Sequence, residues 1–240
     1  MTQIAVPPRV VLPSAADAEE DEFPVAGPSP YFPLLLHIPE GLRWDEEQFR
    51  TFCQQNETLR IERNAEGDLV IMPPAGGETG NRNFRISGRF SVWAEQDGRG
   101  EGFDSSTGFR LPNGAERSPD LAWVLRERLD ALTEEEGERF LPLCPDFVME
   151  LRSPSDRLKP LQEKMEEYLA NGARLGWLID PQNRHVYIYR PNQAVECLDD
   201  PAAVSDDSIL PGFVLDVQAI FDRRIGRAAA GTAGEEEVMR

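Results

Sequence analysis

Short hydrophobic segments with strand-like spacing alternate along the chain with longer segments at helical spacing. Residues 59–63 and 69–72 flank a polar turn at 64–68, and this arrangement predicts a β-hairpin. Other short runs of hydrophobic residues also predict strands. These runs lie at residues 102–110, 118–125, 175–179, 186–189 and 213–217. The strand signals are spread over most of the chain, so the sheet is predicted to be large.

Three helices are predicted outside the central part of the chain. Asp45 with Gln48, and Thr133 with Glu136, have the spacing of a capping box, in which each side chain accepts a hydrogen bond from the backbone of the other residue. Between them, residues 79–96 repeat hydrophobic side chains on one face, which predicts a longer amphipathic helix. Strands and helices interspersed in this way predict an α/β fold with a mixed β-sheet flanked by helices.

The most informative stretch runs from residue 145 to 172. It opens with a hydrophobic segment that predicts a buried strand carrying Glu150, where an ionised carboxylate needs a cation or hydrogen-bond donors. A Ser-Pro-Ser-Asp turn follows, in which Ser155 or Asp156 is predicted to cap the next helix. Lys164 lies beside the hydrophobic stripe of that helix. The strand and the helix are therefore predicted to bring Glu150 and Lys164 to one site.

Metal-dependent hydrolysis of a phosphodiester needs hard oxygen ligands, an activated water and positive charge near the phosphate. Asp146 and Glu150 are roughly 13 Å apart if they share one strand, too far to bind one ion. Asp120 begins a different strand, which can lie beside that of Glu150, so Asp120 and Glu150 are the predicted pair. Arg152 follows on the same face as Glu150, about 7 Å along the strand, and Lys164 can reach the same point.

Composition restricts the function and the location of the protein. The sequence has 25 Lys and Arg against 43 Asp and Glu, a net charge of −18, which argues against a broad basic surface for nucleic acid. Three scattered cysteines and two histidines argue against a disulfide framework, a zinc site and a Ser-His-Asp triad. No hydrophobic run approaches the ~18–20 residues that span a bilayer, and no secretory signal is evident, so a cytoplasmic location is expected.

The chain is predicted to hold one folded domain between two tails. Residues 1–33 are rich in Pro and Ala, contain an acidic run and predict a disordered arm. Residues 34–222 carry the periodic patterns and predict a single domain, which a chain of 240 residues is long enough to form. Residues 223–240 predict a flexible tail.

Several short motifs, in order, resemble the Uma-two family, which belongs to the PD-(D/E)xK, restriction-endonuclease-like superfamily. The motifs that carry the resemblance lie at residues 71–80, 107–112, 118–124, 145–156, 164–168, 176–181 and 210–213. Each motif is short, but their combination and order are specific. The resemblance covers roughly residues 38–221 and leaves out both tails.

The resemblance implies a role for each candidate residue. Asp120 corresponds to the acidic residue of the PD element and Glu150 to that of the (D/E)xK element. Arg152 stands where the motif has a lysine, and the resemblance suggests that Lys164 takes over this role from the helix. Glu78 matches an acidic position that completes a metal site in many of these nucleases. Asp120, Glu150 and Glu78 would then hold Mg²⁺ or Mn²⁺, while Arg152 grips a neighbouring phosphate.

The predicted function is that of a Mg²⁺-dependent endodeoxyribonuclease with DNA as substrate, and the resemblance is compatible with a homodimer. The alternative is a catalytically inactive module of the same fold that acts in protein or nucleic-acid interaction. The net charge of −18 and the arginine at position 152 favour this alternative. A third interpretation is hydrolysis of a non-nucleic phosphoester in a closed acidic pocket.

These interpretations differ in the geometry they require. A nuclease needs the Asp120 and Glu150 carboxylates close together and open to solvent, with Lys164 facing them. An interaction module would let the two carboxylates diverge, or would cap them with internal salt bridges. Glu150 and Glu78 also have purely structural interpretations. Glu150 would be the partner of Arg152 or Lys164, and Glu78 would be a first-turn carboxylate that stabilises the helix dipole.

Overall fold

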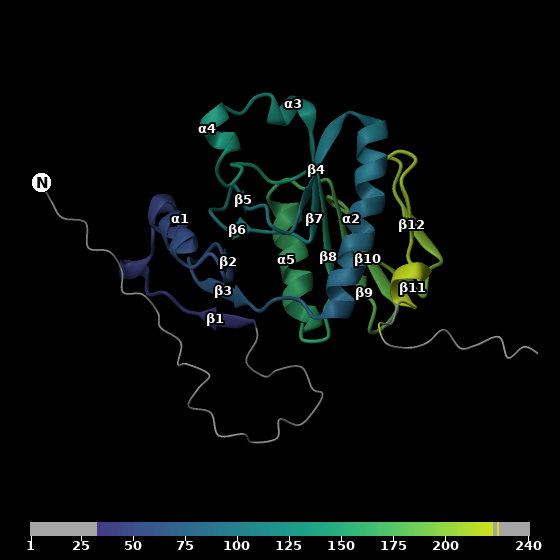
Figure 1. The fold of residues 1–240 in the computed structure, drawn as a ribbon, viewed down its shortest axis with the longest axis horizontal. Helices are drawn as coiled ribbons and strands as arrows, with labels where there is room; N and C mark the ends of the chain where they lie inside the picture. The colour runs from purple at the N-terminus through teal and green to yellow at the C-terminus, as the bar shows by residue number, and fades with distance from the viewer. Residues whose placement is uncertain (1–32, 223–224, 226–240) are drawn as a thin grey trace, which may run out of the picture.

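The computed structural model describes residues 33–222 and residue 225, which form three β-sheets flanked by helices (Figure 1). The predicted arm at residues 1–33 and the predicted tail at residues 223–240 lie almost wholly outside the described residues. The strands are β1 Leu34–Leu36, β2 Arg60–Arg63, β3 Leu69–Met72, β4 Gly100–Asp104, β5 Phe109–Arg110, β6 Glu116–Arg117, β7 Leu121–Leu125, β8 Phe147–Leu151, β9 Leu175–Asp180, β10 His185–Tyr189, β11 Glu196–Asp199, β12 Ala203–Ser205 and β13 Val214–Asp216. The helices are the 3-10 helix η2 Glu40–Leu42, α1 Glu46–Gln55, α2 Gly77–Asp97, α3 Arg126–Leu129, α4 Glu134–Gly137, α5 Leu158–Ala170 and α6 Gln218–Phe221.

The central six-stranded sheet has the strand order β11-β10-β9-β8-β7-β4. Strands β8 and β9 are parallel and are joined through α5, while the other neighbouring strands are antiparallel. A second sheet, β1-β3-β2-β6-β5, contains the hairpin formed by β2 and β3, and β12 pairs with β13 in a small third sheet. This architecture confirms the predicted α/β class with a mixed sheet flanked by helices.

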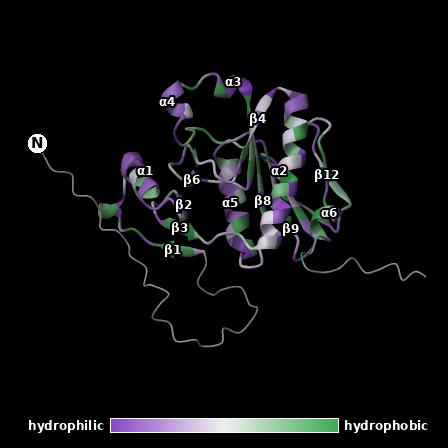
Figure 2. Ribbon diagram, viewed as in Figure 1, coloured by the Kyte–Doolittle hydropathy of each residue, from purple (hydrophilic) through white to green (hydrophobic). Residues whose placement is uncertain are grey.

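Side chains alternate across the central sheet and divide the core into two layers, one under α2 and one under α5 (Figure 1). Trp123 and Met149 pack in the layer with Phe90 of α2. Ala122 and Val148, which point to the opposite face, pack in the layer that contains residues of α5. Both helices carry hydrophobic and hydrophilic stretches, as expected of helices with one buried face (Figure 2). The even-numbered positions of β7 and β8 therefore face α5.

Several local predictions are confirmed. The hairpin forms with Ile61 opposite Ile71. Both capping boxes are present, at the start of α1 and at the start of α4. The long predicted helix is α2.

Among the described residues, no helix is both long and hydrophobic enough to cross a membrane.

Two local predictions are wrong. The strand predicted at 102–110 is two strands, β4 and β5, which belong to different sheets. They are separated by a turn in which the Asp104 carboxylate accepts from the backbone N–H of Ser106 at 2.9 Å. Neither Ser155 nor Asp156 caps α5, because the residue before the helix is Arg157 and its side chain makes no cap bond. The Asp156 carboxylate instead accepts from the backbone N–H of Ser153 at 2.8 Å, within the turn.

Candidate active site

Glu150 lies on β8, and Asp120 directly precedes the neighbouring antiparallel strand β7 at the same end of the central sheet. Leu121 of β7 is paired with Met149 of β8, so extending the register by one residue places Asp120 opposite Glu150. Residues opposite one another in such a pair have Cα atoms roughly 4.5–5.5 Å apart. The backbone N–H of Leu151 donates to Asp120 Oδ2 at 2.9 Å, which fixes the carboxylate at the end of β8. The structure thus brings this predicted pair together.

Lys164 enters the site from α5 and contacts Glu150 directly. Its Nζ atom lies 2.7 Å from Glu150 Oε1. One turn further along α5, the Tyr168 hydroxyl donates to the same oxygen at 3.3 Å. Both side chains lie on the helix face that packs on the sheet, because positions four residues apart share a face. Among the described residues, the Glu150 carboxylate makes its two polar contacts, with Lys164 and Tyr168, through Oε1.

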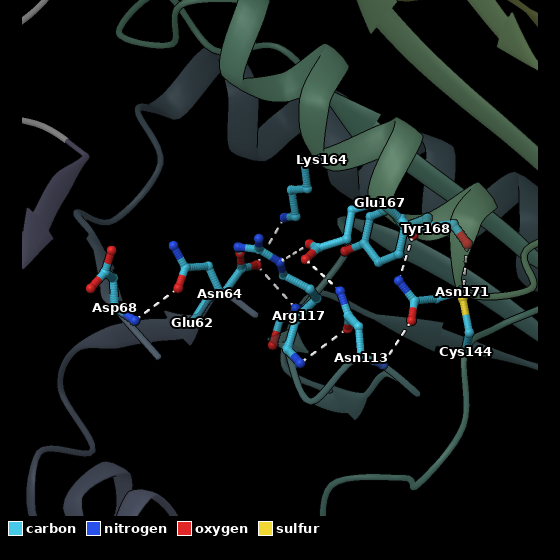
Figure 3. Close-up of polar contacts among 12 residues, drawn as sticks. Glu62, Asn64, Asp68, Asn113, Arg117, Cys144, Lys164, Glu167, Tyr168 and Asn171 are labelled. Carbon is cyan, nitrogen blue, oxygen red and sulfur yellow. Dashed lines mark hydrogen bonds and ion pairs between the residues drawn. The ribbon is translucent and has the colours of Figure 1, made fainter. Parts of the chain in front are cut away.

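A second buried carboxylate, Glu62, binds the same ammonium group. Glu62 lies on β2 of the hairpin, and its Oε1 is 2.8 Å from Lys164 Nζ (Figure 3). Sequence analysis missed this residue, because a charged residue within a hairpin strand is usually exposed. Its signal was the alternation of Arg60, Ile61 and Glu62, which places two opposite charges on one face of the strand. That face lines the site.

Two arginines complete the charge network. Arg117 lies between Glu62 and Glu167, with Nε 2.6 Å from Glu167 Oε2 and Nη1 3.3 Å from Glu62 Oε2 (Figure 3). Arg60 donates to the backbone oxygen of Ser118 at 2.7 Å and lies 3.5 Å from Asp120 Oδ1. Three cations thus face four carboxyl groups, so the acidic groups of the network outnumber the basic ones.

Burial and the uneven distribution of charge shift the pKa values in opposite directions. Burial raises the pKa of Glu150 to about 7, the Lys164 ammonium opposes this rise, and the charge of Asp120 adds to it. Burial also acts to raise the pKa of Glu62, but the charges of Lys164 and Arg117 outweigh it and lower that pKa to about 2. Burial acts to lower the pKa of Lys164, yet Glu150 and Glu62 together hold it above its usual value. Lys164 is therefore a charged ammonium at neutral pH.

The site lies in a cleft of about 1010 Å³ between the hairpin, the start of α2 and the first half of α5. Its charged lining residues include Arg60, Glu62, Arg117, Asp120, Glu150, Lys164 and Glu167. Its hydrophobic lining comes from Leu35, Val70, Met72 and Leu161, together with several prolines. Glu150 faces this cleft although its side chain is only 5% exposed. The second oxygen of Glu150, Oε2, has no hydrogen-bond or ionic partner among the described residues, whereas Oε1 has two.

The remaining two predicted site residues do not line the described cleft. Arg152 Nη1 lies 2.8 Å from Asp180 Oδ2, and Arg152 Nε donates to the backbone oxygen of Asp156 at 3.2 Å. Glu78 lies in the first turn of α2, where it is 3.4 Å from Arg82 Nη2. Both side chains thus have local ionic partners outside the cluster around Lys164.

The donor set of the cluster fits a small divalent cation. Within residues 33–222, no group of three or more His, Cys, Asp or Glu side chains is arranged to hold a metal ion. Mg²⁺, however, is commonly held by one or two carboxylates together with water and substrate phosphate. Asp120 and Glu150 supply two such carboxylates at one point. The raised pKa of Glu150 marks a place where additional positive charge would stabilise the ionised form.

Comparison with known proteins identifies the family and the fold of the chain. Residues 46–218 match the Uma2 family, described as "Putative restriction endonuclease". No curated protein matches the chain. A similar solved structure is that of "a putative nuclease belonging to DUF820 from Anabaena variabilis ATCC 29413", with a TM-score of 0.59, 21% sequence identity, and coverage of 67% of this chain and 89% of that chain. That likeness shows a shared fold. Because the family match spans well over half of the sequence, the chain belongs to the Uma2 family of restriction-endonuclease-like proteins.

Proposed function

We propose that the protein is a metal-dependent endonuclease that hydrolyses phosphodiester bonds in DNA. The observation that carries this proposal is the placement of Lys164 against Glu150, with Asp120 opposite Glu150, in an open cleft. Two carboxylates and an ammonium at one point are the groups that metal-assisted phosphodiester hydrolysis requires. Membership of the Uma2 family supports a nuclease, and the DNA substrate and the metal are part of the proposal.

Asp120 and Glu150 would hold Mg²⁺ or Mn²⁺. When bound, the cation lowers the pKa of a coordinated water and neutralises charge on the scissile phosphate. Glu150 would have Oε2 available for the cation, since Oε1 already contacts Lys164 and Tyr168. The backbone N–H of Leu151 holds Asp120 in place for the same task.

Lys164 would stabilise the negative charge that builds on the phosphate during attack. Its raised pKa suits this electrostatic role, because a group that stays protonated at neutral pH does not act as a general base. Arg152 and Glu78 remain candidates for binding a neighbouring phosphate and for completing the metal site. Each would first have to release its present ionic partner, Asp180 and Arg82 respectively.

The test combines calorimetry with a plasmid-nicking assay. Mg²⁺ and Mn²⁺ are titrated into the wild type and into Glu150→Gln, and the same proteins are assayed for metal-dependent nicking. The matched control is Glu116→Gln, because Glu116 is also a buried carboxylate, lies 3.1 Å from an arginine, and has a pKa that burial raises to about 7. Glu116 lies on β6 of the five-stranded sheet and does not line the cleft that contains Lys164.

The expected result is metal binding and nicking by the wild type and by Glu116→Gln, with both lost in Glu150→Gln. Absence of metal binding by the wild type at millimolar concentration would refute the proposed mechanism. Equal metal affinity in the wild type and Glu150→Gln would refute the assignment of Glu150. Cleavage of RNA but not DNA would keep the site and change the substrate.

Two observations favour a second candidate function, a catalytically inactive module that acts in protein or nucleic-acid interaction. Both carboxylates are already met by internal cations, Glu150 by Lys164 and Asp120 by Arg60. The net charge of −18 also disfavours a polyanionic substrate. This candidate predicts no metal-dependent nicking, and a structure whose stability does not change when Mg²⁺ is added.

A further inference from the structure

Glu62 connects parts of the site that come from different regions of the fold. Its Oε1 accepts from the backbone N–H of Ser118 at 3.0 Å and from Lys164 Nζ at 2.8 Å. Its Oε2 lies 3.3 Å from Arg117 Nη1. The side chain is 2% exposed. One buried carboxylate of the five-stranded sheet is therefore held by donors from α5 and from the segment that leads into β7.

Both connections lead to groups assigned to the reaction. Ser118 lies two residues before Asp120, so the bond to its backbone N–H fixes the short segment from which the Asp120 carboxylate extends. Lys164 carries the ammonium that contacts Glu150. We propose that Glu62 is a positioning residue that sets the locations of Lys164 and Asp120, an inference that rests on the proposed nuclease function.

The geometry also explains why a second acidic partner for Lys164 is useful. An ammonium group has three N–H donors. Within the described part of the chain, two of them are directed at Glu62 and Glu150, which leaves the third for water or a phosphate oxygen in the cleft. Without Glu62, the carboxylate that still contacts the Lys164 ammonium is Glu150, a proposed metal ligand. Glu62 thus shares the Lys164 ammonium with Glu150, so the ammonium is not committed to a proposed metal ligand alone.

The first test is a double-mutant cycle on cleavage. Glu62→Gln keeps the length of the side chain and removes its charge. We expect a fall in kcat of about 10- to 100-fold, the usual effect of losing a group that orients a metal-site residue, with little change in KM for DNA. In a Lys164→Met background the same substitution should lower kcat by about twofold or less, because Lys164 is already absent and the new amide oxygen can still accept from the backbone N–H of Ser118, which holds the segment before Asp120. Glu116→Gln is the control for loss of a buried carboxylate and should change kcat little in either background.

The second test does not depend on activity. The side-chain ammonium of Lys164 is observed by ¹⁵N NMR and identified by its loss in Lys164→Met. Glu62→Gln should shift this resonance and accelerate its hydrogen exchange, whereas Glu116→Gln should leave it unchanged. If Glu62→Gln does not fold, Glu62→Asp retains the charge but withdraws the carboxylate by one methylene, and it should produce the same direction of change in both tests.

The outcomes separate the two proposals. Loss of kcat that depends on the presence of Lys164, with an altered Lys164 resonance, supports the positioning role. Equal losses of kcat in both backgrounds, or a Lys164 resonance that Glu62→Gln and Glu62→Asp leave unchanged, would overturn it. If the wild type does not cleave nucleic acid, the nuclease proposal fails, and the NMR result alone decides whether Glu62 positions Lys164.

Discussion

Replacing Lys164 by methionine should destabilise the protein in a strongly pH-dependent manner. The substitution keeps a long side chain on α5 but removes the only ammonium that faces Glu62 and Glu150 among the described residues. All three side chains are largely buried, with exposed fractions of 10%, 2% and 5% for Lys164, Glu62 and Glu150 respectively. Two carboxylates would then remain in the interior with Arg117 and Arg60 as the nearby cations.

The size of the effect follows from the pKa values. In the wild type the pKa of Glu62 falls from 4.5 to about 2, which corresponds to about 3 kcal/mol of stabilisation at neutral pH. Part of this depends on Arg117, which remains in the variant. Removing one partner of a buried ion pair typically costs about 3–5 kcal/mol. We therefore expect Lys164→Met to lower the free energy of unfolding by about 3 kcal/mol or more at pH 8.

The contribution of Glu62 to stability should depend on pH with opposite signs in the wild type and in Lys164→Met. In the wild type its folded pKa is lowered, so its stabilisation is present above pH 4.5 and is lost as the pH falls towards about 2. In Lys164→Met the folded pKa values of Glu62 and Glu150 rise, since the ammonium that favours the ionised forms is gone. A raised pKa stabilises the fold at low pH and loses that contribution as the pH increases. The difference between wild type and variant should therefore shrink by about 1 kcal/mol or more between pH 8 and pH 5.

Urea unfolding monitored by tryptophan fluorescence at pH 5, 6.5 and 8 measures both quantities, with Trp123 and Trp177 in the core as probes. The matched control is Lys159→Met on the same helix, because Lys159 is 85% exposed and forms only a surface pair with Glu163 at 3.6 Å. This control should change stability by about 0.5 kcal/mol or less at every pH. A loss for Lys164→Met that is the same at pH 5 and pH 8, or below about 1 kcal/mol at pH 8, would show that the two carboxylates do not depend on this ammonium.

Two further predictions concern the framework of the site. Asp146→Asn should lower the free energy of unfolding by about 1–3 kcal/mol and leave metal affinity unchanged, since the buried Asp146 carboxylate accepts from Leu125 N–H and Arg128 at 3.0 Å each and lies outside the cleft; a fall in metal affinity measured by calorimetry would contradict this. Gly100→Ala should lower the free energy of unfolding by about 1–3 kcal/mol, because an added Cβ would overlap the backbone oxygen of Val124. An unchanged Tm in thermal unfolding would mean that β4 can shift away.

The sequence predicts the part of the site that depends on local pattern. Glu150 on a hydrophobic strand, and Lys164 beside a helical hydrophobic stripe, follow from periodicity alone. That Asp120 begins a neighbouring strand also follows from the pattern, although the register that sets it opposite Glu150 depends on long-range pairing. These residues are recognisable because each one departs from an otherwise regular hydrophobic segment.

Other features depend on contacts between segments far apart in sequence, which no local pattern specifies. The role of Glu62 requires the hairpin to pack against α5, and its sequence context resembles that of any exposed hairpin strand. The true start of α5 could not be read from Asp156, because a carboxylate in a turn can accept from several nearby N–H groups. The Asp156 side chain bonds within the turn to Ser153. The partners of Arg152 and Glu78 are likewise fixed only in the folded chain.

The bond between Glu62 and Lys164 joins residues separated by 102 positions. During synthesis at about 5–20 residues per second, Glu62 would wait about 5–20 s for its partner to be made. The hairpin therefore leaves the ribosome before either cation that Glu62 contacts, Arg117 or Lys164, has been made. The charge network around Lys164 can form only after α5 has been synthesised, when most of the domain already lies outside the ribosome.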